Sequence, residues 1–578
     1  MSARAPQGFL PTKSELKAAF TSVSPSTRLG IIGLLVIGTI SLLGLLWQLN
    51  TKAIVSVAVP GGIIEEGIIG TPRFINPLLA ISDADRDMVR LIYSGLMRRT
   101  AKGELIPDLA EKVEASADGT RFTFYLKEGL TWHDGTPLTS RDVEFTILQA
   151  RDPNVQSPRR AVWEGVSIER PDDTTIIFTL KQPFAGFLDS TTIGIIPQHL
   201  WEKISPENFT FSEYNTSPVG SGPYVIDNID KDGSGITTAY HLKPFSNFAL
   251  GAAKVDVTIR IYPNEAERLS AYERGEITAM AAIDPSTASK LKAEGATIKE
   301  AELPRIFGVF FNQNQNPVFT HREVRLALDT AIDKKAIVSK TLLGYGKPLA
   351  GPTISQLDTR SGSEADHLKA AALILEKAGW QKNTSGIYEK KTKTSTEILK
   401  FTINTNDTPE LKEVANTLSA TWRKLGALVE VKIFDSGNLQ QQVIRPRKYD
   451  ALLFGQIIGR EPDLFAFWHS SQRLDPGLNI AGYTNSSVDK FLERARTSVD
   501  PSAQTKDTDA ALLTIMNDIP AVFLYTPSFI YVVPPEIKSM NVGTIQNTGD
   551  RFNDIYHAYS RTEYVWKVFA SPSSIITN

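Results

Sequence analysis

The sequence predicts an α/β protein of several domains that is preceded by a single membrane-spanning helix. A charge-free apolar run near the N-terminus predicts the helix, and helix-like and strand-like patterns that alternate beyond residue 50 predict layered α/β domains. At 578 residues the chain is too long for one hydrophobic core. With 42% hydrophobic and 22% charged residues, its composition is that of a globular protein.

The overall charge and the lack of cysteine exclude several classes of partner and chemistry. A net charge of −2 provides no basic field for nucleic acid, so no nucleic-acid partner is predicted. The chain contains no cysteine. Disulfides, thiolate metal sites, a cysteine nucleophile and a lipid-modified cysteine anchor are therefore excluded.

The apolar run at residues 29–49 reads LGIIGLLVIGTISLLGLLWQL. A helix of about 21 residues, at about 1.5 Å per residue, crosses a hydrocarbon core of about 30 Å. A buried core helix rarely runs this long without a polar face. The apolar region of a cleaved signal peptide is usually shorter and ends at a small-x-small site. The pattern therefore favours an uncleaved anchor over both alternatives.

Basic residues are concentrated before this run. Four precede it and one follows closely: Arg4, Lys13, Lys17, Arg28 and Lys52. The positive-inside rule then makes residues 1–28 a cytoplasmic tail. The predicted topology is that of a single-pass cell-membrane protein, with the bulk of the chain extracellular or periplasmic.

Elements can be assigned in order beyond the anchor. Residues 53–59 (AIVSVAV) are a β-branched run that ends at a Pro-Gly-Gly turn, so a strand is expected directly after the membrane. Residues 83–96 have helical spacing, with Met88, Leu91 and Leu96 on one side. These apolar positions are expected in the core.

The clearest local signals lie in residues 91–147. Residues 120–126 alternate between apolar and polar side chains, which is typical of a half-buried strand. Thr139 is predicted to be the N-cap of a helix whose apolar run begins at Val143. A second strand is expected at residues 174–180.

The second half of the chain continues the alternation of helix and strand. Residues 320–323 (THRE) predict a capping box at the start of one helix. Another helix opens at Thr408 and ends at Gly426. Strands are predicted at residues 427–434 and 449–454.

An enzyme was considered as an alternative to a binding protein. His133 and Asp134 are adjacent and could form a general base with its orienting acid. Neighbours in a tight turn seldom face each other, so a solvent-facing turn is the favoured interpretation. The other histidines occur singly, and there is no HExxH motif or phosphate loop. No catalytic residue, metal site or cofactor is predicted.

Several segments resemble the signature segments of a known family. In chain order they are LIYSGLMRR, GELIPDLAEKVEASADGTRFTFYLKEGLTWHDGTPLTSRDVEFTI, SPVGSGPYVI, VDVTIRIYPNEAERLSAYERGEI, FFNQNQNPVFTHREVRLALDTAIDKKAIV and AALILEKAGW. Together they resemble the family 5 extracellular solute-binding proteins, the peptide- and nickel-binding components of ABC importers. The resemblance covers essentially all of the chain from about residue 53.

The resemblance implies a fold of the type II periplasmic-binding-protein class, with two lobes and three domains. Domain I is then discontinuous, at residues 53–75, 197–302 and 527–578. Domain II is inserted at residues 76–196. Domain III forms the second lobe at residues 303–526, and the ligand is expected in the cleft between the lobes.

The resemblance also implies which residues line that cleft. The implied ligand-binding residues are Ala80, Ile81, Ser82, Trp163, Met280, Ala281, Ala282, Gly455, Gln456, Ile457 and Ile458. For Trp163, an ordinary packed aromatic remains an equally open interpretation.

One segment departs from the family pattern. Members that bind a free peptide amine resemble one another in a GW-x-x-D segment, whose aspartate pairs with the ammonium. This chain has FGQIIGREPDLFAFWH, where Gln456 replaces the tryptophan and the nearest acids, Glu461 and Asp463, are displaced. Our hypothesis is a peptide or peptide-like ligand held mostly through its backbone and by apolar contacts, or one whose amine is blocked or differently placed.

The predicted function is capture of this solute outside the membrane by a tethered binding component. The expected partners are the permease and ATPase subunits of an ABC transporter, and the membrane itself through the N-terminal helix. The alternative is a membrane-anchored receptor or scaffold of the same fold that is not coupled to import. A hydrolase acting on peptides or cell-wall fragments is disfavoured because the sequence has no catalytic set.

Overall fold

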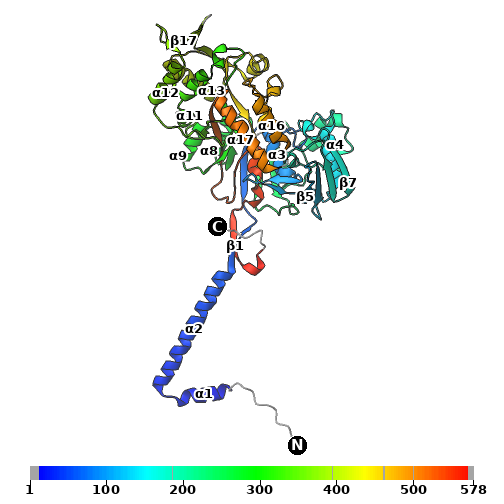
Figure 1. Cartoon of the computed structure of the whole chain (residues 1–578). Coiled ribbons are helices and arrows are strands. Elements are labelled where there is room, and N and C mark those ends of the chain that lie inside the picture. The colour runs from blue at the N-terminus through cyan, green and yellow to red at the C-terminus, as the bar shows by residue number, and fades with distance from the viewer. Residues whose placement is uncertain (1–11, 185, 393–394, 460–462, 499, 571–578) are drawn as a thin grey trace. The chain divides into compact units, whose positions relative to one another are not determined.

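The computed structural model describes residues 12–184, 186–392, 395–459, 463–498 and 500–570 of the chain. The chain divides into two compact units. The terminal unit comprises Met1–Pro60 and Arg561–Asn578, and the main unit comprises Gly61–Ser560. Each unit is described by itself (Figure 1).

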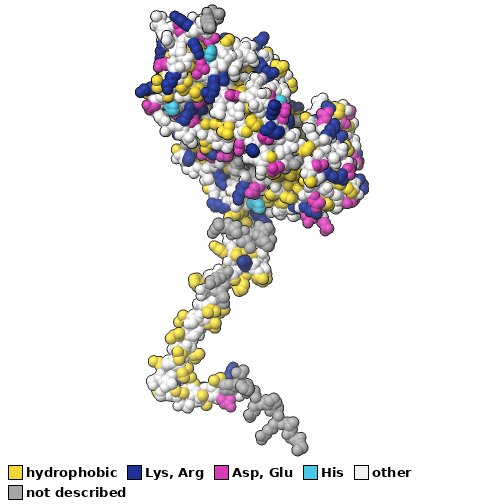
Figure 2. Space-filling view, viewed as in Figure 1, with side chains coloured by type: hydrophobic (Ala, Val, Ile, Leu, Met, Phe, Trp, Pro, Cys, Tyr) yellow, Lys and Arg dark blue, Asp and Glu magenta, His cyan; other side chains and the backbone are white. Residues whose placement is uncertain are grey.

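One long helix dominates the terminal unit. α2 (Pro25–Ala53) begins at its N-cap Ser24, whose hydroxyl accepts the N–H of Thr27. The stretch Pro25–Gln48 has a mean hydropathy of 2.5, and none of its most apolar window is buried. Figure 2 shows apolar side chains along this helix. By length and composition, α2 can cross a membrane.

A two-stranded ribbon completes the terminal unit. β1 (Ile54–Val59) follows α2 directly, which confirms the strand expected there. It pairs antiparallel with β23 (Arg561–Trp566) from the far end of the chain. A 3₁₀ turn, η8 (Lys567–Phe569), follows β23.

A 12-stranded mixed sheet organises the main unit. Its order is β20-β19-β21-β14-β22-β12-β2-β11-β10-β9, and β13 and β15 also pair with β22. The strands of this sheet are β2 (Ile63–Ile69), β9 (Tyr224–Lys231), β10 (Thr237–Pro244), β11 (Asp256–Tyr262), β12 (Ala279–Ala281), β13 (Ile298–Glu302), β14 (Arg305–Phe311), β15 (Gly346–Pro348), β19 (Lys400–Asn406), β20 (Leu428–Phe434), β21 (Ala451–Ile457) and β22 (Ala521–Val532).

Strand β22 changes partners along its length. Its first part pairs with β14 and β15, and the part beyond Pro527 pairs with β12 and β13. The predicted domain boundary after residue 302 falls between β13 and β14. The predicted boundary after residue 526 falls where β22 changes partner. The division into three domains itself remains a prediction.

Smaller sheets and helices surround this frame. The other strands are β3 (Met97–Arg99), β4 (Leu105–Pro107), β5 (Ala110–Ala115), β6 (Arg121–Leu126), β7 (Ser167–Asp172), β8 (Thr175–Thr179), β16 (Gln381–Lys382), β17 (Tyr388–Lys391) and β18 (Thr396–Ile398). The helices are α1 (Lys13–Ser22), α3 (Asp83–Ile92), α4 (Ser140–Arg151), α5 (Arg160–Trp163), α6 (Phe187–Ser190), α7 (Gln198–Trp201), α8 (Glu265–Glu273), α9 (Pro285–Ala293), α10 (Arg322–Thr330), α11 (Lys334–Thr341), α12 (Glu364–Lys377), α13 (Pro409–Leu425), α14 (Ser436–Asn438), α15 (Leu464–Trp468), α16 (Ser486–Thr497) and α17 (Pro501–Asp518).

The segment predicted most clearly from sequence forms a small antiparallel sheet and a helix. The sheet has the order β5-β6-β8-β7, so the strands expected at residues 120–126 and 174–180 are confirmed. Thr139 is the N-cap of α4, and its N–H donates to Asp142 at 2.9 Å. Figure 1 shows α4, β5 and β7 grouped together, and α11, α12 and α13 grouped elsewhere in the main unit.

Helix α13 also follows its sequence signals. Its inward residues are buried as predicted: Leu411, Val414, Leu418, Trp422 and Leu425. Gly426 ends the helix at φ 118°, a left-handed conformation that favours glycine.

Two local predictions were wrong. α3 ends at Ile92 and not near Leu96, because Tyr93 is extended and the following chain pairs with the segment at Thr191–Ile195, where Ile195 donates to Ser94. The capping box at residues 320–323 does not form. Thr320 belongs to a preceding 3₁₀ turn and its hydroxyl donates to the Pro317 carbonyl, so the N-cap of α10 is His321.

Candidate functional site

Two adjoining cavities form a continuous cleft in the main unit. The first, of about 280 Å³, is lined by residues 77–99, 159–163, 189–194 and 546–550. We call it the arginine cavity. The second, of about 490 Å³, extends from the same wall to α15, α16 and α17, and we call it the bridging cavity. They share four lining residues: Arg99, Asp189, Ser190 and Gln546.

The arginine cavity carries an excess of positive charge. Four arginines line it, against two aspartates: Arg86, Arg90, Arg99, Arg159, Asp189 and Asp550. Arg99 pairs with Asp189 at 2.5 Å, and Arg90 pairs with Asp550 at 3.2 Å. Within the part of the chain that the structure describes, Arg159 has no ion-pair partner. Both aspartates are thus already engaged, and positive charge is left over for a ligand.

Helix α3 brings two of these arginines to the cavity. Its N-cap Ser82 and Asp85 form a reciprocal capping box, which fixes where the helix begins. Its apolar face is buried in the core. Arg86 and Arg90, four residues apart, therefore lie on the same side of the helix and face the cavity.

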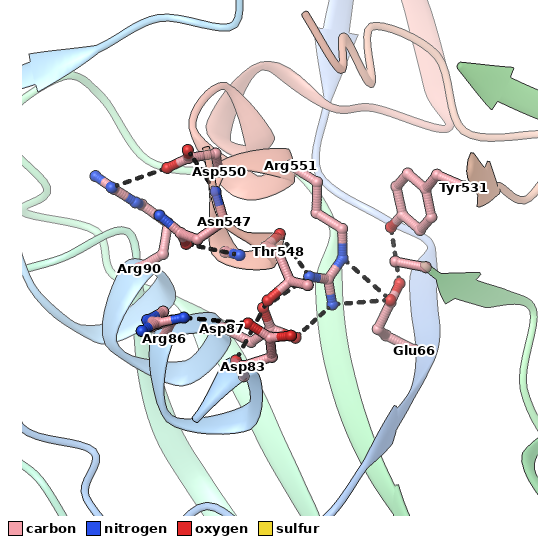
Figure 3. Close-up of polar contacts among 12 residues, drawn as sticks. Glu66, Asp83, Arg86, Asp87, Arg90, Tyr531, Asn547, Thr548, Asp550 and Arg551 are labelled. Atoms are coloured by element: carbon pink, nitrogen blue, oxygen red, sulfur yellow. Dashed lines mark hydrogen bonds and ion pairs between the residues drawn. The ribbon is translucent and has the colours of Figure 1, made fainter. Parts of the chain in front are cut away.

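A buried ion network holds α3 in place (Figure 3). Arg551 donates to Glu66 on β2 at 3.0 Å and to Asp87 on α3 at 2.8 Å, and its side chain is only 1% exposed. The hydroxyl of Tyr531 on β22 donates to Glu66 at 2.7 Å. The adjoining Asp550 holds Arg90. This network joins α3 to the central sheet, so the arginines are presented by a rigid wall.

The electrostatics of the cavity favour an anion. Burial lowers the pKa of both Arg90 and Arg159. The positive charge of Arg98 adds to this lowering of the pKa at Arg90, and that of Arg86 does so at Arg159. A carboxylate placed between these guanidinium groups would offset the repulsion and accept paired hydrogen bonds.

Two predicted ligand residues lie at the arginine cavity. Ala80 and Trp163 both line it. The indole of Trp163 is only 1% exposed and packs against Phe178 and Phe187, with ring centroids 5.5 and 5.7 Å away. Its ring is thus mainly a core aromatic with one edge at the wall. Both interpretations of Trp163 stay open.

Two residues beside Ala80 have different surroundings. Ile81 is 61% exposed and does not line the arginine cavity or the bridging cavity. Ser82 caps α3, since its hydroxyl accepts the N–H of Asp85 at 3.0 Å. The identity of Ser82 therefore has a structural explanation, and its ligand contact remains a prediction.

The predicted residues at the end of β12 do not line the arginine cavity or the bridging cavity. Met280 and Ala281 lie on β12, which pairs with β2 and β22, and their side chains are buried in two different core clusters. The carbonyl of Ala281 accepts a hydrogen bond from Arg268 at 2.8 Å. Ala282 is exposed at φ 55°, and its N–H donates to Ile530. The side chains of Met280 and Ala281 are thus buried in this structure, and the ligand contacts of residues 280–282 remain predictions.

The predicted residues of β21 line a separate cavity of about 390 Å³, which we call the β21 cavity. Gly455, Gln456 and Ile457 contribute to its wall. The side-chain nitrogen of Gln456 donates to the Leu478 carbonyl at 2.9 Å. Ile458 is buried in the neighbouring core.

Packing explains the glycine at position 455. A Cβ there would lie 2.6 Å from the ring of Phe307. The structure thus brings Ala80 and Trp163 together at one cavity, and Gly455, Gln456 and Ile457 together at another.

The sequence analysis missed the arginines of the cleft. One signal was available, because Arg86 and Arg90 are spaced by four residues on the polar side of an amphipathic helix. No local signal indicates Arg159 or Asp550. They reach the cavity only because segments separated by nearly 400 residues pack together.

The His133 and Asp134 side chains have different partners. Asp134 and Gly135 are exposed, as expected of a solvent-facing turn, whereas the ring of His133 is partly buried. Nδ1 of His133 accepts the N–H of Gly220 at 3.3 Å, and its Nε2 donates to the Gly222 carbonyl at 3.1 Å. Burial lowers the pKa of His133 to about 4. Asp134 instead pairs with His199 at 2.8 Å. Among the described residues, no cluster of three or more His, Cys, Asp or Glu could hold a metal ion.

Comparisons with known proteins agree on one family. The family model described as bacterial extracellular solute-binding proteins, family 5 Middle, matches residues 104–474. Oligopeptide-binding protein AppA of Bacillus subtilis is 29% identical over 510 residues, which cover 85% of this chain and 91% of AppA.

Solved structures show the same similarity along nearly the whole main unit. The ABC transporter substrate-binding protein CtaP of Listeria monocytogenes is 26% identical with a TM-score of 0.73, covering 87% of this chain and 99% of CtaP. NikZ of Campylobacter jejuni, solved in complex with Ni(L-His), is 25% identical with a TM-score of 0.67, covering 87% of this chain and all of NikZ.

Proposed function

The chain belongs to the bacterial extracellular solute-binding proteins of family 5, and from this premise we propose that it is the membrane-tethered binding component of an ABC importer. Its fold is that of the type II periplasmic binding proteins, as the sequence predicted. Members of this family are binding proteins and not enzymes. The proposed cargo is a peptide or peptide-like solute captured between the two lobes and delivered to the permease.

The arginine cavity is the observation that carries the proposal. It adjoins the bridging cavity, whose far wall comes from the predicted second lobe. Together they have the size and mixed polarity of a small-molecule site. Arg159, which has no ion-pair partner among the described residues, and Arg86, 3.3 Å from the exposed Asp83, favour a ligand with a free carboxylate. A peptide offers one at its C-terminus or on an acidic side chain.

Two carboxylates line the bridging cavity but not the arginine cavity: Asp463 and the exposed Asp509. Asp463 lines the bridging cavity, where it pairs with Arg496 at 3.4 Å and caps α15. Glu461 lies outside the described residues. The hypothesis that the ligand amine is blocked or differently placed rests on Gln456 of the β21 cavity, which offers an amide and no carboxylate. Asp509 is the alternative partner for a free amine.

Tethering by α2 would help to deliver the solute to the permease. A helix of this length and hydropathy can hold the binding unit at the outer surface, with residues 1–28 in the cytoplasm. Confinement near the membrane raises the effective concentration of the loaded protein at the permease. The permease would then bind the form of the protein whose lobes the ligand has closed.

Thermal-shift titration with four versions of one peptide tests the ligand class. The versions have both ends free, the amine acetylated, the carboxylate amidated, or both ends blocked. We expect amidation to remove most of the stabilisation and acetylation to leave it nearly unchanged. A strong preference for the free amine would overturn our hypothesis for that end of the ligand.

Two further measurements test the proposal as a whole. Mass spectrometry of solutes that copurify with the chain should find carboxylate-bearing peptides or peptide-like molecules. Uptake of the stabilising peptide by cells with and without the chain tests coupling to import. Binding without any difference in uptake would contradict the importer role.

A further inference from the structure

The C-terminal end of the terminal unit exposes an unusual group of large apolar side chains. They lie on β23 and η8, with exposed fractions of 79% for Tyr564, 53% for Trp566, 78% for Val568 and 83% for Phe569. Exposed apolar side chains gathered in one short segment indicate a surface that contacts a partner. The ribbon of β1 and β23 has only two strands, which gives it little burial of its own.

The position of this segment indicates the partner. α2 ends at Ala53 and β1 begins at Ile54, so no linker separates the helix from the ribbon. Trp566 pairs directly with Ile54. Because the strands are antiparallel, the chain beyond Trp566 continues from the ribbon back toward the end of α2.

The depth of the segment follows from helix geometry. The charge-free run ends at residue 49, and Ile54 follows five residues later, which is about 7.5 Å of helix. The polar headgroup layer extends about 5 to 8 Å beyond each side of the hydrocarbon core. With α2 across the membrane, Trp566 lies at the level of the headgroups, and η8 lies at that level or deeper.

We infer that β23 and η8 dock on the outer surface of the lipid bilayer, so that the terminal unit contacts the membrane at a second place besides α2. This inference rests on the proposed tether, because it requires α2 to span the bilayer. Tyr564 and Trp566 lie on the same face of the ribbon, and Trp and Tyr are the residues that favour the membrane interface. Lys567, the next residue, supplies a cation for lipid phosphates.

Docking would give the ribbon the burial that it lacks as an isolated pair of strands. Val568 and Phe569 would insert among the acyl chains while the polar backbone of the ribbon stays in the headgroup layer. The terminal unit would then be fixed to the membrane by a helix and by a surface contact. Rotation of the ribbon about the helix axis would be restricted.

The cysteine-free chain allows a direct test with single introduced cysteines. Full-length Val568→Cys, Leu42→Cys and Leu513→Cys variants are labelled with an environment-sensitive fluorophore and placed in lipid nanodiscs. Leu42 lies in α2, and Leu513 is a 64% exposed residue of the main unit. Emission is compared between ordinary lipids and lipids brominated on the acyl chain near the headgroup.

We expect loss of emission by bromine quenching at positions 568 and 42, each compared with the signal of the main-unit label at 513. In a Trp566→Ser, Phe569→Ser background, the quenching at 568 should be lost while that at 42 persists. Quenching at 42 without quenching at 568 would overturn the inference and leave the tether intact. Absence of quenching at 42 would overturn both. A blue-shifted label at 568 that bromine does not quench would indicate a protein contact, such as a second copy, and would also overturn it.

Discussion

The arginine cavity and the β21 cavity differ in charge and in how the chain builds them. The first is lined by four arginines and two aspartates from α3, from residues 159–163 and 189–194, and from residues 546–550. The second is lined mostly by apolar and amide groups of residues 440–480, with one arginine and one aspartate. The lining of the first cavity therefore carries more arginines than aspartates, whereas the lining of the second is balanced.

The difference separates two kinds of recognition. A wall of fixed cations selects for a charged group and its position. A neutral wall with a backbone-bonded amide selects for shape and apolar contact. We therefore expect substitutions at the first cavity to change binding according to ligand charge, and substitutions at the second to change it little. The predictions below test this contrast, from the largest expected effect to the smallest.

Arg551→Ala should have the largest effect. It leaves Glu66 and Asp87 buried without their cation, and loss of one partner of a buried ion pair costs about 3–5 kcal/mol. Urea unfolding should show this loss together with loss of ligand binding, because α3 loses its connection to the sheet. Arg274→Ala, which removes an exposed pair with Glu276, is the control and should leave the stability nearly unchanged. Equal stabilities of the two variants would contradict the role of the network.

His133 makes the wall behind the arginine cavity sensitive to pH. It holds Gly220 and Gly222, and the N–H of Gly222 donates to Ile92 at the end of α3. Its folded pKa is about 4, below the value of about 6.5 expected when unfolded. The unfolded chain then binds more protons between these values, so stability falls as pH decreases from about 6.5 to 4.

The size of this effect is up to about 3 kcal/mol. His133→Gln should remove this part of the pH dependence, as measured by urea unfolding of both proteins across the range. The contributions of other titrating groups to the pH dependence are the same in both proteins and cancel when the unfolding free energies are subtracted. A constant difference in unfolding free energy from pH 7 to pH 4 would contradict the assignment.

Arg159→Gln tests the charge of the cavity without disturbing an internal ion pair. A charge-assisted hydrogen bond contributes about 1.5–3 kcal/mol, so affinity for a carboxylate-bearing peptide should fall at least about tenfold. Affinity for the amidated peptide should hardly change. The adjacent Arg160 is exposed like Arg159 but does not line the cavity, so Arg160→Gln is the matched control. The same loss in both variants would indicate a general effect of charge and not a site.

Local chemistry explains why the fold was predictable and most of the site was not. The N-cap Thr139, the alternating strand β6 and the stop at Gly426 depend on neighbours within a few residues, and the sequence predicts each of them. The arginine cavity depends on α3 packing against residues 547–551, which are separated from it by more than 400 residues in the chain. The early end of α3 has the same origin, because Tyr93 leaves the helix to follow a distant segment.

The smallest effect is expected at Gln456, where the chain departs from the family pattern. Gln456→Leu removes one hydrogen bond to the Leu478 carbonyl and leaves the volume of the side chain similar, so the stability cost is about 1 kcal/mol. Affinity for a carboxylate-bearing peptide should stay within about threefold, since Gln456 itself carries no charge. Isothermal titration with the free and acetylated peptides measures both affinities. A large loss for the free peptide alone would place the amine at Gln456 and make the β21 cavity the charged end of the site, which would reverse the contrast between the two cavities.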